Sequence, residues 1–165
     1  MKAQPLTSKE ITAPFTQRLI EDMYYTLEKK RYGVGLAAPQ VGSSLAIAVV
    51  GIKATPTRPG LKNEKLTLIN PEIITFYGKK TGMWEGCISG STLYAKAMRH
   101  KSIRIKWQDE KALMHEEDFD GLRAQVLQHE VDHLNGILFV DRVRDPKTYM
   151  TISEYKKQRK QGRAF

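Results

Sequence analysis

Residues 128–133, with the sequence QHEVDH, constrain this chain more than any other stretch. In a helix, His129 and His133 lie four residues apart on one face, close enough to bind one metal ion. Glu130 is one step round the helix, poorly placed as a third ligand but well placed to contact a water at the metal. Two buried histidines bonded to backbone carbonyls are the alternative, but the complete HExxH pattern favours a metal site.

The flanking residues indicate that this helix lies in the core. Apolar side chains occur on most of its sides, so the two imidazoles would lose their hydration and need a partner. Asp120 fits an N-cap, and Asn135 with Gly136 fits a C-terminal stop. The sequence therefore predicts a buried, metal-binding helix between these residues.

Two further helices are expected. Apolar residues recur every four positions after Pro14, which suits a first helical turn: Phe15, Leu19, Met23 and Leu27. This spacing predicts an amphipathic helix over residues 14–30. Residues 153–161 form the second candidate, whereas residues 1–10 look unstructured.

Apolar and alternating runs predict short strands in most of the remaining chain. These runs cover residues 45–52, 66–69, 72–77, 83–87, 103–107 and 113–119, with a loop over residues 53–64. Strands packed around one buried helix make the fold class α+β.

Length and composition describe one soluble domain. The 165 residues are enough to bury a core, and 41% are apolar, without a long uncharged apolar run. The start, MKAQP, leads into polar residues and does not resemble a signal peptide. The single cysteine excludes an internal disulfide framework and fits a reducing cytosol. We therefore expect a cytoplasmic protein without a membrane contact, and a monomer.

A catalytic metal site usually takes three protein ligands and a water, so a third ligand is needed. The common zinc-peptidase patterns are incomplete in this chain. The position six residues after His133 holds Phe139 instead of histidine, and Glu154, about twenty residues downstream, lies in a basic tail.

Cys87 is the best candidate for the missing ligand. A lone cysteine is usually a small buried apolar residue. Beside Gly86, in a chain that already holds two candidate ligands, a thiolate ligand is the better interpretation. His100 and His115 are the rival candidates, although charged neighbours suggest that both are exposed.

Three separated segments resemble the motifs of the peptide deformylases. Residues 33–40, GVGLAAPQ, resemble the family's G-x-G-L-A-A-x-Q motif, residues 85–89, EGCIS, resemble E-G-C-L-S, and residues 128–133 resemble Q-H-E-x-D-H. Weaker similarity extends over residues 11–143. The resemblance implies removal of the formyl group from the N-terminal formylmethionine of new polypeptides. It also implies antiparallel sheets packed around the metal-binding helix.

Four residues outline the metal chemistry. Cys87, His129 and His133 give a three-ligand site with one open position for water, whose pKa a metal lowers to about 7 in favourable sites. Glu130 takes the proton and returns it to the leaving amine. The resemblance implies one divalent ion, natively Fe²⁺ in many members, while the ligand set also suits Zn²⁺, Ni²⁺ or Co²⁺.

The tetrahedral oxyanion needs hydrogen-bond donors aimed at it. The resemblance implies that these are the side-chain amide of Gln40 and the backbone N–H of Ile88, together with the metal. The alternative for Gln40 is a loop amide that bonds its own backbone.

An extended formylmethionyl peptide is the implied substrate. Gly33 and Gly35 let a backbone approach closely, so the peptide could pair with this loop and with the strand over residues 83–87. Glu85 and Gly86 on that strand are therefore predicted substrate contacts. For Glu85, fixing the cysteine loop through a bond to an arginine is the better explanation.

The sequence departs from the family pattern at two places, and the second of them leaves the substrate preference open. Ile88 replaces the usual leucine, and residues 90–92, GST, stand where most members carry an aliphatic residue and proline. The alternative function is a deformylase-like hydrolase of another small N-acyl amide or ester. A third hypothesis is a basic, RNA-binding domain with a structural metal, but such sites normally use four protein ligands.

The net charge of +9 concentrates near the end of the chain. The sequence predicts a catalytic metal-hydrolase domain over residues 1–146 and a basic, partly helical tail over residues 147–165. With few apolar anchors, the tail is expected to leave that domain folded when it is removed. It is either a solvated end or a segment that attracts a polyanion. The resemblance to bacterial enzymes implies contact with the ribosome.

Overall fold

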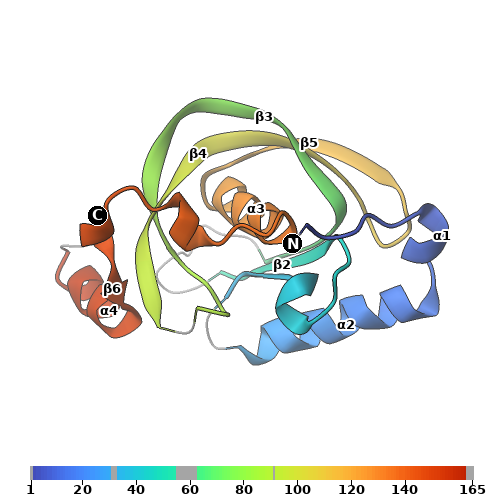
Figure 1. Cartoon of the computed structure of the whole chain (residues 1–165), viewed down its shortest axis with the longest axis horizontal. Coiled ribbons are helices and arrows are strands. Elements are labelled where there is room, and N and C mark those ends of the chain that lie inside the picture. Colours follow the sequence, from blue (N-terminus) through green and yellow to red (C-terminus); the bar gives the residue numbers. More distant parts are fainter. Residues whose placement is uncertain (1, 31–32, 55–62, 91, 163–165) are drawn as a thin grey trace.

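The structure, a computed structural model, describes residues 2–30, 33–54, 63–90 and 92–162. One antiparallel sheet curves around helix α3 (Gly121–Leu134), which it encloses from above and below in Figure 1. The strand order is β1-β2-β3-β4-β5, and β6 pairs with the start of β4. The α+β class and the buried central helix are confirmed. The predicted loop over residues 53–64 falls largely outside the described residues.

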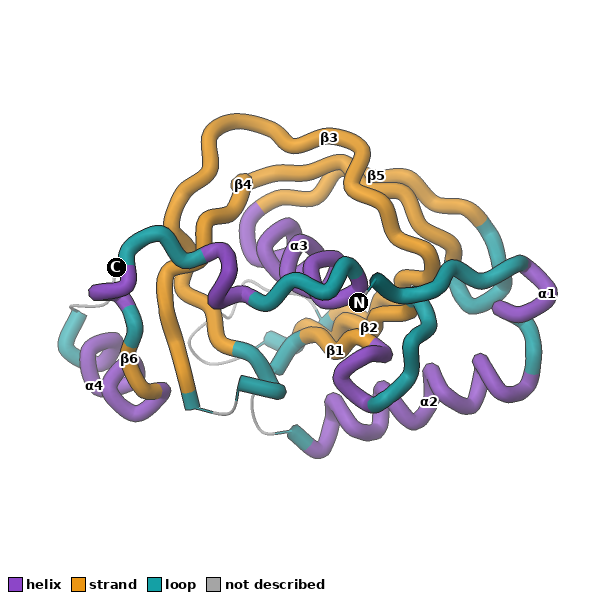
Figure 2. Tube along the Cα trace, viewed as in Figure 1, coloured by secondary structure: helices purple, strands orange, loops and turns teal. Residues whose placement is uncertain are grey.

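The strands follow in chain order: β1 Gly35–Ala37, β2 Ile47–Ile52, β3 Glu64–Gly86, β4 Leu93–Gln108, β5 Met114–Asp120 and β6 Met150–Thr151. The other α-helices are α1 Ser8–Ile11, α2 Pro14–Lys29 and α4 Ile152–Lys160. Short 3₁₀ helices occupy Ala38–Val41, Phe139–Arg142 and Pro146–Thr148. Figure 2 shows α2 beneath β1 and β2, and α4 beside the ends of β3 and β4.

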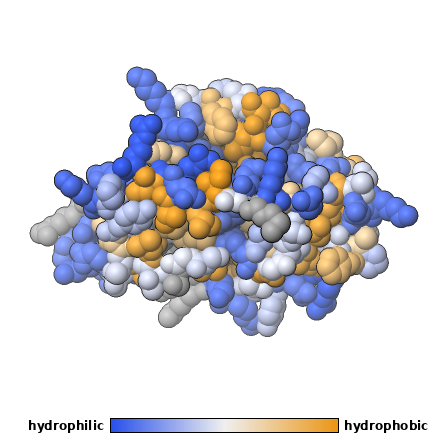
Figure 3. Space-filling model, in the orientation of Figure 1, coloured by the Kyte–Doolittle hydropathy of each residue, from blue (hydrophilic) through white to orange (hydrophobic). Residues whose placement is uncertain are grey.

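Strand β2 separates two parts of the core. Ile47 and Val49 pack toward α2, whereas Ala48 and Val50 pack toward α3. Successive side chains of a strand point to opposite faces, so a strand covered on both faces must be apolar throughout. This explains the uninterrupted apolar run at this position. On the surface in Figure 3, hydrophobic residues form patches among hydrophilic ones.

Helix α2 has the predicted bounds to within one residue, but its buried face differs. Thr16, Ile20, Met23 and Leu27 are buried, whereas Phe15 is 71% exposed. A spacing of exactly four residues drifts around a helix that has 3.6 residues per turn. Extrapolating the stripe back to Phe15 therefore placed it on the wrong side.

The N-terminal segment is not unstructured, and that prediction is wrong. The Ala3 N–H donates to the Leu134 carbonyl at the end of α3 (2.7 Å), and Gln4 forms a parallel bridge with Leu45. Ala3 and Leu6 are buried in the core. The partners of this segment are far away in sequence, so no local pattern announces its structure.

Strands β3 and β4 are longer than predicted. The three short strands expected over residues 66–87 form one strand, with register shifts that include the Asn70–Pro71 position. Asn70 has φ +52°, and its side chain bonds the backbone N–H and carbonyl of Leu6 (2.8 and 2.7 Å). Hydrogen bonds with the N-terminal segment thus hold Asn70 at this irregular point, and β3 continues beyond it.

The tail is partly helical, and the segment before α4 pairs with the sheet, although none of the residues of α4 is buried. The two residues of β6 pair with Leu93 and Tyr94, and the Ile152 N–H donates to the Thr92 carbonyl (2.8 Å). None of the helices in the described part of the chain is long and apolar enough to cross a membrane.

Candidate metal centre and substrate cleft

Three possible metal-ligand atoms, two from α3 and one from the residue after β3, lie close together. His129 and His133 lie one turn apart on this helix, with their Nε2 atoms 3.1 Å from each other. The Cys87 sulfur, just after β3, lies 3.2 Å from Nε2 of His133. Ligand atoms around one tetrahedral ion with bonds of about 2.0–2.3 Å are separated by roughly 3.3–3.6 Å. The donor set therefore fits a single divalent ion.

The rival ligands lie elsewhere. His100 bonds the Gly78 carbonyl through Nδ1 (2.8 Å), and His115 bonds Asp109 through Nε2 (2.9 Å). Among the described residues, the group of side chains able to hold a metal contains Cys87 and the two histidines of α3, and neither rival.

The charge balance at this point also favours a cation. Burial raises the pKa of the Cys87 thiol, but hydrogen bonds and positive charge from His129 and His133 outweigh burial and lower it to about 5. Burial opposes protonation of His129, yet the Cys87 sulfur and the Glu85 carboxylate raise its pKa to about 10. A thiolate and a carboxylate together stabilise positive charge where the donor atoms meet.

Glu85 fixes the orientation of His129. Nδ1 of His129 donates to Oε2 of Glu85 (3.0 Å), which leaves Nε2 of the neutral ring as its ligand atom. Burial opposes ionisation of Glu85, but hydrogen bonds from His129 and Arg99 lower its pKa to about 2. Glu85 lines the cleft, yet these contacts favour the structural role over the predicted substrate contact.

Arg99 links Glu85 to the helix from the opposite side. Its Nε and Nη2 donate to both Glu85 oxygens (2.8 and 3.0 Å), and Nη1 donates to Asp132. Arg142 completes the network by binding both Asp132 oxygens. Removing one partner of a buried pair costs about 3–5 kcal/mol, because the other charge is left uncompensated. Sequence reasoning did not identify these arginines, although two motif carboxylates in a core require counter-charges.

Glu130 follows His129 on α3 and lines the same cleft. Its Oε1 lies close to β1, where a Cβ added to Gly35 would come within 2.2 Å of it. Its buried Oε2 has no hydrogen-bond partner among the described residues. Burial raises the pKa of Glu130 to about 7, against the opposing charge of His129 and His133. A carboxyl that titrates near neutrality is suited to accept and return a proton.

Gln40 is held so that its amide nitrogen faces the cysteine. The Ala37 N–H donates to its Oε1 (2.8 Å), and its Nε2 donates to the Ser89 hydroxyl (2.9 Å) and the Cys87 sulfur (3.3 Å). The hydrogen bond from Ala37 to Gln40 lies within the loop, as the alternative interpretation of Gln40 predicted. It also turns the amide nitrogen toward Cys87, so the two interpretations of Gln40 are compatible.

The glycines of the motifs make room for neighbouring side chains. Gly33, at φ +140°, leaves space for Ile88, because a Cβ there would come within 2.4 Å of the isoleucine side chain. A Cβ on Gly86 would come within 2.2 Å of the Tyr94 ring. These close approaches involve the protein itself, while the predicted peptide contact stays a prediction.

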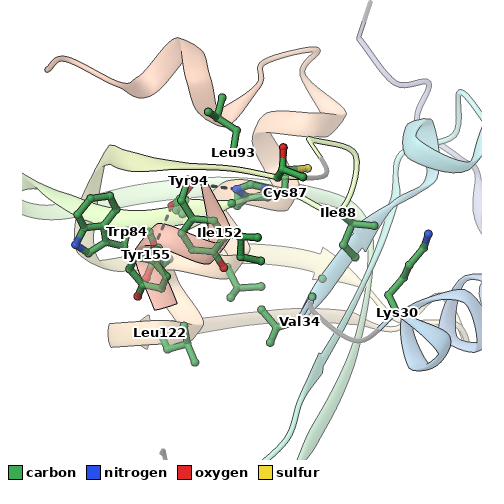
Figure 4. Close-up of a pocket in the computed structure, with 18 of the residues that line it drawn as sticks. Lys30, Val34, Trp84, Cys87, Ile88, Leu93, Tyr94, Leu122, Ile152 and Tyr155 are labelled. Carbon is green, nitrogen blue, oxygen red and sulfur yellow. Dashed lines mark hydrogen bonds and ion pairs between the residues drawn. The ribbon is translucent and has the colours of Figure 1, made fainter. Parts of the chain in front are cut away.

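One cleft of about 710 Å³ connects these groups. Of the ten predicted site residues, His133 alone does not line it; the others are Gly33, Gly35, Gln40, Glu85, Gly86, Cys87, Ile88, His129 and Glu130. Figure 4 shows Cys87 and Ile88 between an aromatic group, formed by Trp84, Tyr94 and Tyr155, and Lys30 on the opposite side. The volume is in the range that encloses a small organic ligand or a short peptide.

Peptide deformylases are among the known proteins with similar sequences. The sequence profile of the family described as Polypeptide deformylase matches residues 1–149. A peptide deformylase of Leptospira biflexa is 38% identical over 151 residues, covering 89% of this chain and 83% of the relative. One from Zymomonas mobilis is 40% identical over 144 residues, covering 87% and 81%.

Solved structures agree with the sequence matches. The Met-Ala-Ser-bound class I type b peptide deformylase from Acinetobacter baumannii has a TM-score of 0.80 at 34% identity, covering 87% of this chain and 90% of that one. A peptide deformylase from Legionella pneumophila has a TM-score of 0.77 at 35% identity, covering 97% and 90%.

Proposed function

The chain belongs to the polypeptide deformylase family, a family of metal-dependent enzymes that remove the formyl group from the N-terminal formylmethionine of new polypeptides, and we propose how its residues divide this work. Cys87, His129 and His133 would hold the ion. The observation that carries the assignment is the convergence of their donor atoms beside the buried Glu130 carboxylate. When bound, the ion supplies a Lewis acid and an acidified water.

The remaining roles follow from the contacts. Glu130 takes a proton from the attacking water at Oε2 and passes it to the leaving nitrogen. The amide nitrogen of Gln40, fixed through its Oε1, donates to the oxygen of the formyl group. The Ile88 N–H is the proposed second donor, and loss of one such donor typically costs about 10²–10³ in rate. Glu85 and Arg99 position His129.

The proposed substrate is an extended formylmethionyl peptide, and Met-Ala-Ser in the Acinetobacter baumannii relative supports a cleft that takes at least three residues. Fe²⁺ is the proposed native ion, because two imidazoles and one thiolate suit it and the family resemblance favours it. Zn²⁺, Ni²⁺ or Co²⁺ would fit the same ligands. We also propose that the protein is a cytoplasmic monomer, with the single free cysteine supporting a reducing compartment.

Formate release from formyl-Met-Ala-Ser tests the proposal directly. With anaerobically purified protein, we expect turnover of this peptide and stoichiometric iron. The acetyl analogue should react about 10- to 200-fold more slowly, which is the discrimination expected for one extra carbon. Faster turnover of the acetyl peptide or of an aryl ester would favour the alternative hydrolase, and zinc in place of iron would overturn the metal assignment.

Ribosome contact through α4 is a separate proposal, supported by exposed basic side chains that do not line the cleft. Lys157 and Lys160 are exposed on this helix. We expect Lys157→Glu/Lys160→Glu to weaken co-sedimentation with ribosomes and to lower the salt slope of binding by about two, because each lost phosphate contact contributes about 0.9. Turnover of a short formyl peptide should stay unchanged. Wild-type co-sedimentation by the double variant would refute the contact.

A further inference from the structure

One face of α4 belongs to the cleft. Ile152, Tyr155, Lys156 and Arg159 line it, and their spacing of three and four residues places them on one side of the helix. Lys157 and Lys160 lie at other positions around the helix and are exposed. The basic tail therefore has a cleft face and a solvent face, a division that its charge pattern alone does not reveal.

An aromatic stack holds this face in place. The Tyr155 ring stacks on Tyr94 with centroids 4.6 Å apart, and it meets Trp84 at 5.3 Å. Figure 4 shows the three rings together at one end of the cleft. Tyr94 itself lies against Gly86, directly before the cysteine of the metal site. The wall formed by α4 is therefore continuous with the strand that carries Cys87.

The charge of the cleft changes from its floor to its rim. The lining carboxylates, Glu85 and Glu130, are almost fully buried, and Arg99 compensates Glu85. The cations Lys30, Lys156 and Arg159 line the outer part, where side chains are half-buried or exposed. Among the described residues, none forms an ion pair with Arg159. The rim thus presents positive charge to whatever extends out of the cleft.

We propose that α4 is a wall of the substrate cleft and that Arg159 on it selects peptides with a carboxylate beyond the formylmethionine. This inference rests on the proposed function, because the peptide is its substrate. The carboxylate is either an acidic side chain or the free C-terminus of a short peptide, since both offer the same planar acceptor to a guanidinium. Arg159 acts on specificity and takes no part in the bond-breaking step.

The test compares peptides that differ in one charge. Amidated formyl-Met peptides carry Asp or the isosteric Asn at the second, third or fourth residue, and formyl-Met-Ala-Ala is used as acid and as amide. The wild type should prefer the Asp peptide at one position by about two- to fivefold in kcat/KM, the range of a half-exposed ion pair. The preference should appear as a lower KM for the Asp peptide, and it should become smaller as the salt concentration rises.

Three variants identify the residue responsible. Arg159→Gln should abolish the preference and Arg159→Glu should invert it, measured within each variant as the ratio of kcat/KM for the Asp peptide to kcat/KM for the Asn peptide. Lys160→Glu is the matched control, with the same charge change on the same helix at an exposed position, and should keep the preference. If the Asp peptides show no preference but kcat/KM is higher for the acid form of formyl-Met-Ala-Ala than for its amide, the C-terminus is the source of the carboxylate.

A preference that survives in Arg159→Glu at every position, or that Lys160→Glu removes equally, overturns the proposal. Circular dichroism checks that each variant is folded. Calorimetric titration with the unformylated peptides measures the preference without turnover, as the ratio of Kd for the Asn peptide to Kd for the Asp peptide. A chain that binds with this ratio but releases no formate would thus contradict the proposed function and still support the subsite.

Discussion

Replacing Glu130 with glutamine is expected to lower kcat for formyl-Met-Ala-Ser by about 10²- to 10⁴-fold, the usual contribution of a general acid–base group. Glutamine has nearly the same shape, so it fits beside Gly35 where the carboxylate now lies. Because Glu130 is not a proposed ligand, the variant should keep the wild-type metal content. Steady-state formate release and metal analysis of the same sample measure the two quantities.

Glu117→Gln is the matched control for this variant. Glu117 is an exposed carboxylate on β5, so its loss should leave both activity and metal content unchanged. A near wild-type kcat in Glu130→Gln would contradict the assignment of the base. A parallel loss of metal would instead show that Glu130 supports the ligand site.

Removing the thiolate should have a second large effect, because Cys87→Ala takes away one of three proposed ligands. We expect a loss of more than 100-fold in metal affinity, beyond the roughly 10- to 100-fold that a supporting residue contributes. Activity should fall with metal content. The side chain is small and only half-buried, so the fold should survive its removal.

The rival histidines provide the controls for this experiment. His100→Ala and His115→Ala remove side chains that bond Gly78 and Asp109, and both variants should keep the metal after dialysis. Full metal content in Cys87→Ala, or its loss in either histidine variant, would show that the ligand set is wrong.

The local features of the site were predictable because their information lies in short stretches. The HExxH spacing on an apolar segment required a buried helix, and the chain has only one cysteine to offer. The asparagine and glycine after this helix stop it as predicted: Asn135 is the C-cap, and Gly136 has φ +74°.

Strand β4 shows where such reasoning fails. Its inward-facing positions include Ala95, Ala97, Ile103 and Ile105, but Arg99 interrupts the apolar series. A bond from Glu85 to an arginine was predicted, but nothing local in the sequence gives a reason to choose Arg99 for it. The reason is an ion pair with Glu85 and Asp132, whose charges become neighbours only after folding. The predicted strand therefore began too late.

The cleft wall was unpredictable for a related reason. Tyr155, Tyr94 and Trp84 are separated by up to 71 residues, and each alone is an ordinary amphipathic aromatic residue. The charge run around Tyr155 suits a solvated end or a segment that binds a polyanion, and neither interpretation places this helix in the cleft. The pairing of β6 with β4 and the stacking of Tyr155 on Tyr94 bring this helix back to the cleft.

The bond from Ala3 to Leu134 has a practical consequence for metal measurements. It places the first residues of the chain next to the end of the helix that carries His133. A polyhistidine tag at this end of the chain would be tethered to the helix through Ala3 and would add imidazoles that bind the same transition metals. Metal analysis of this protein is best done after such a tag has been cleaved, or with a tag that contains no histidine or cysteine.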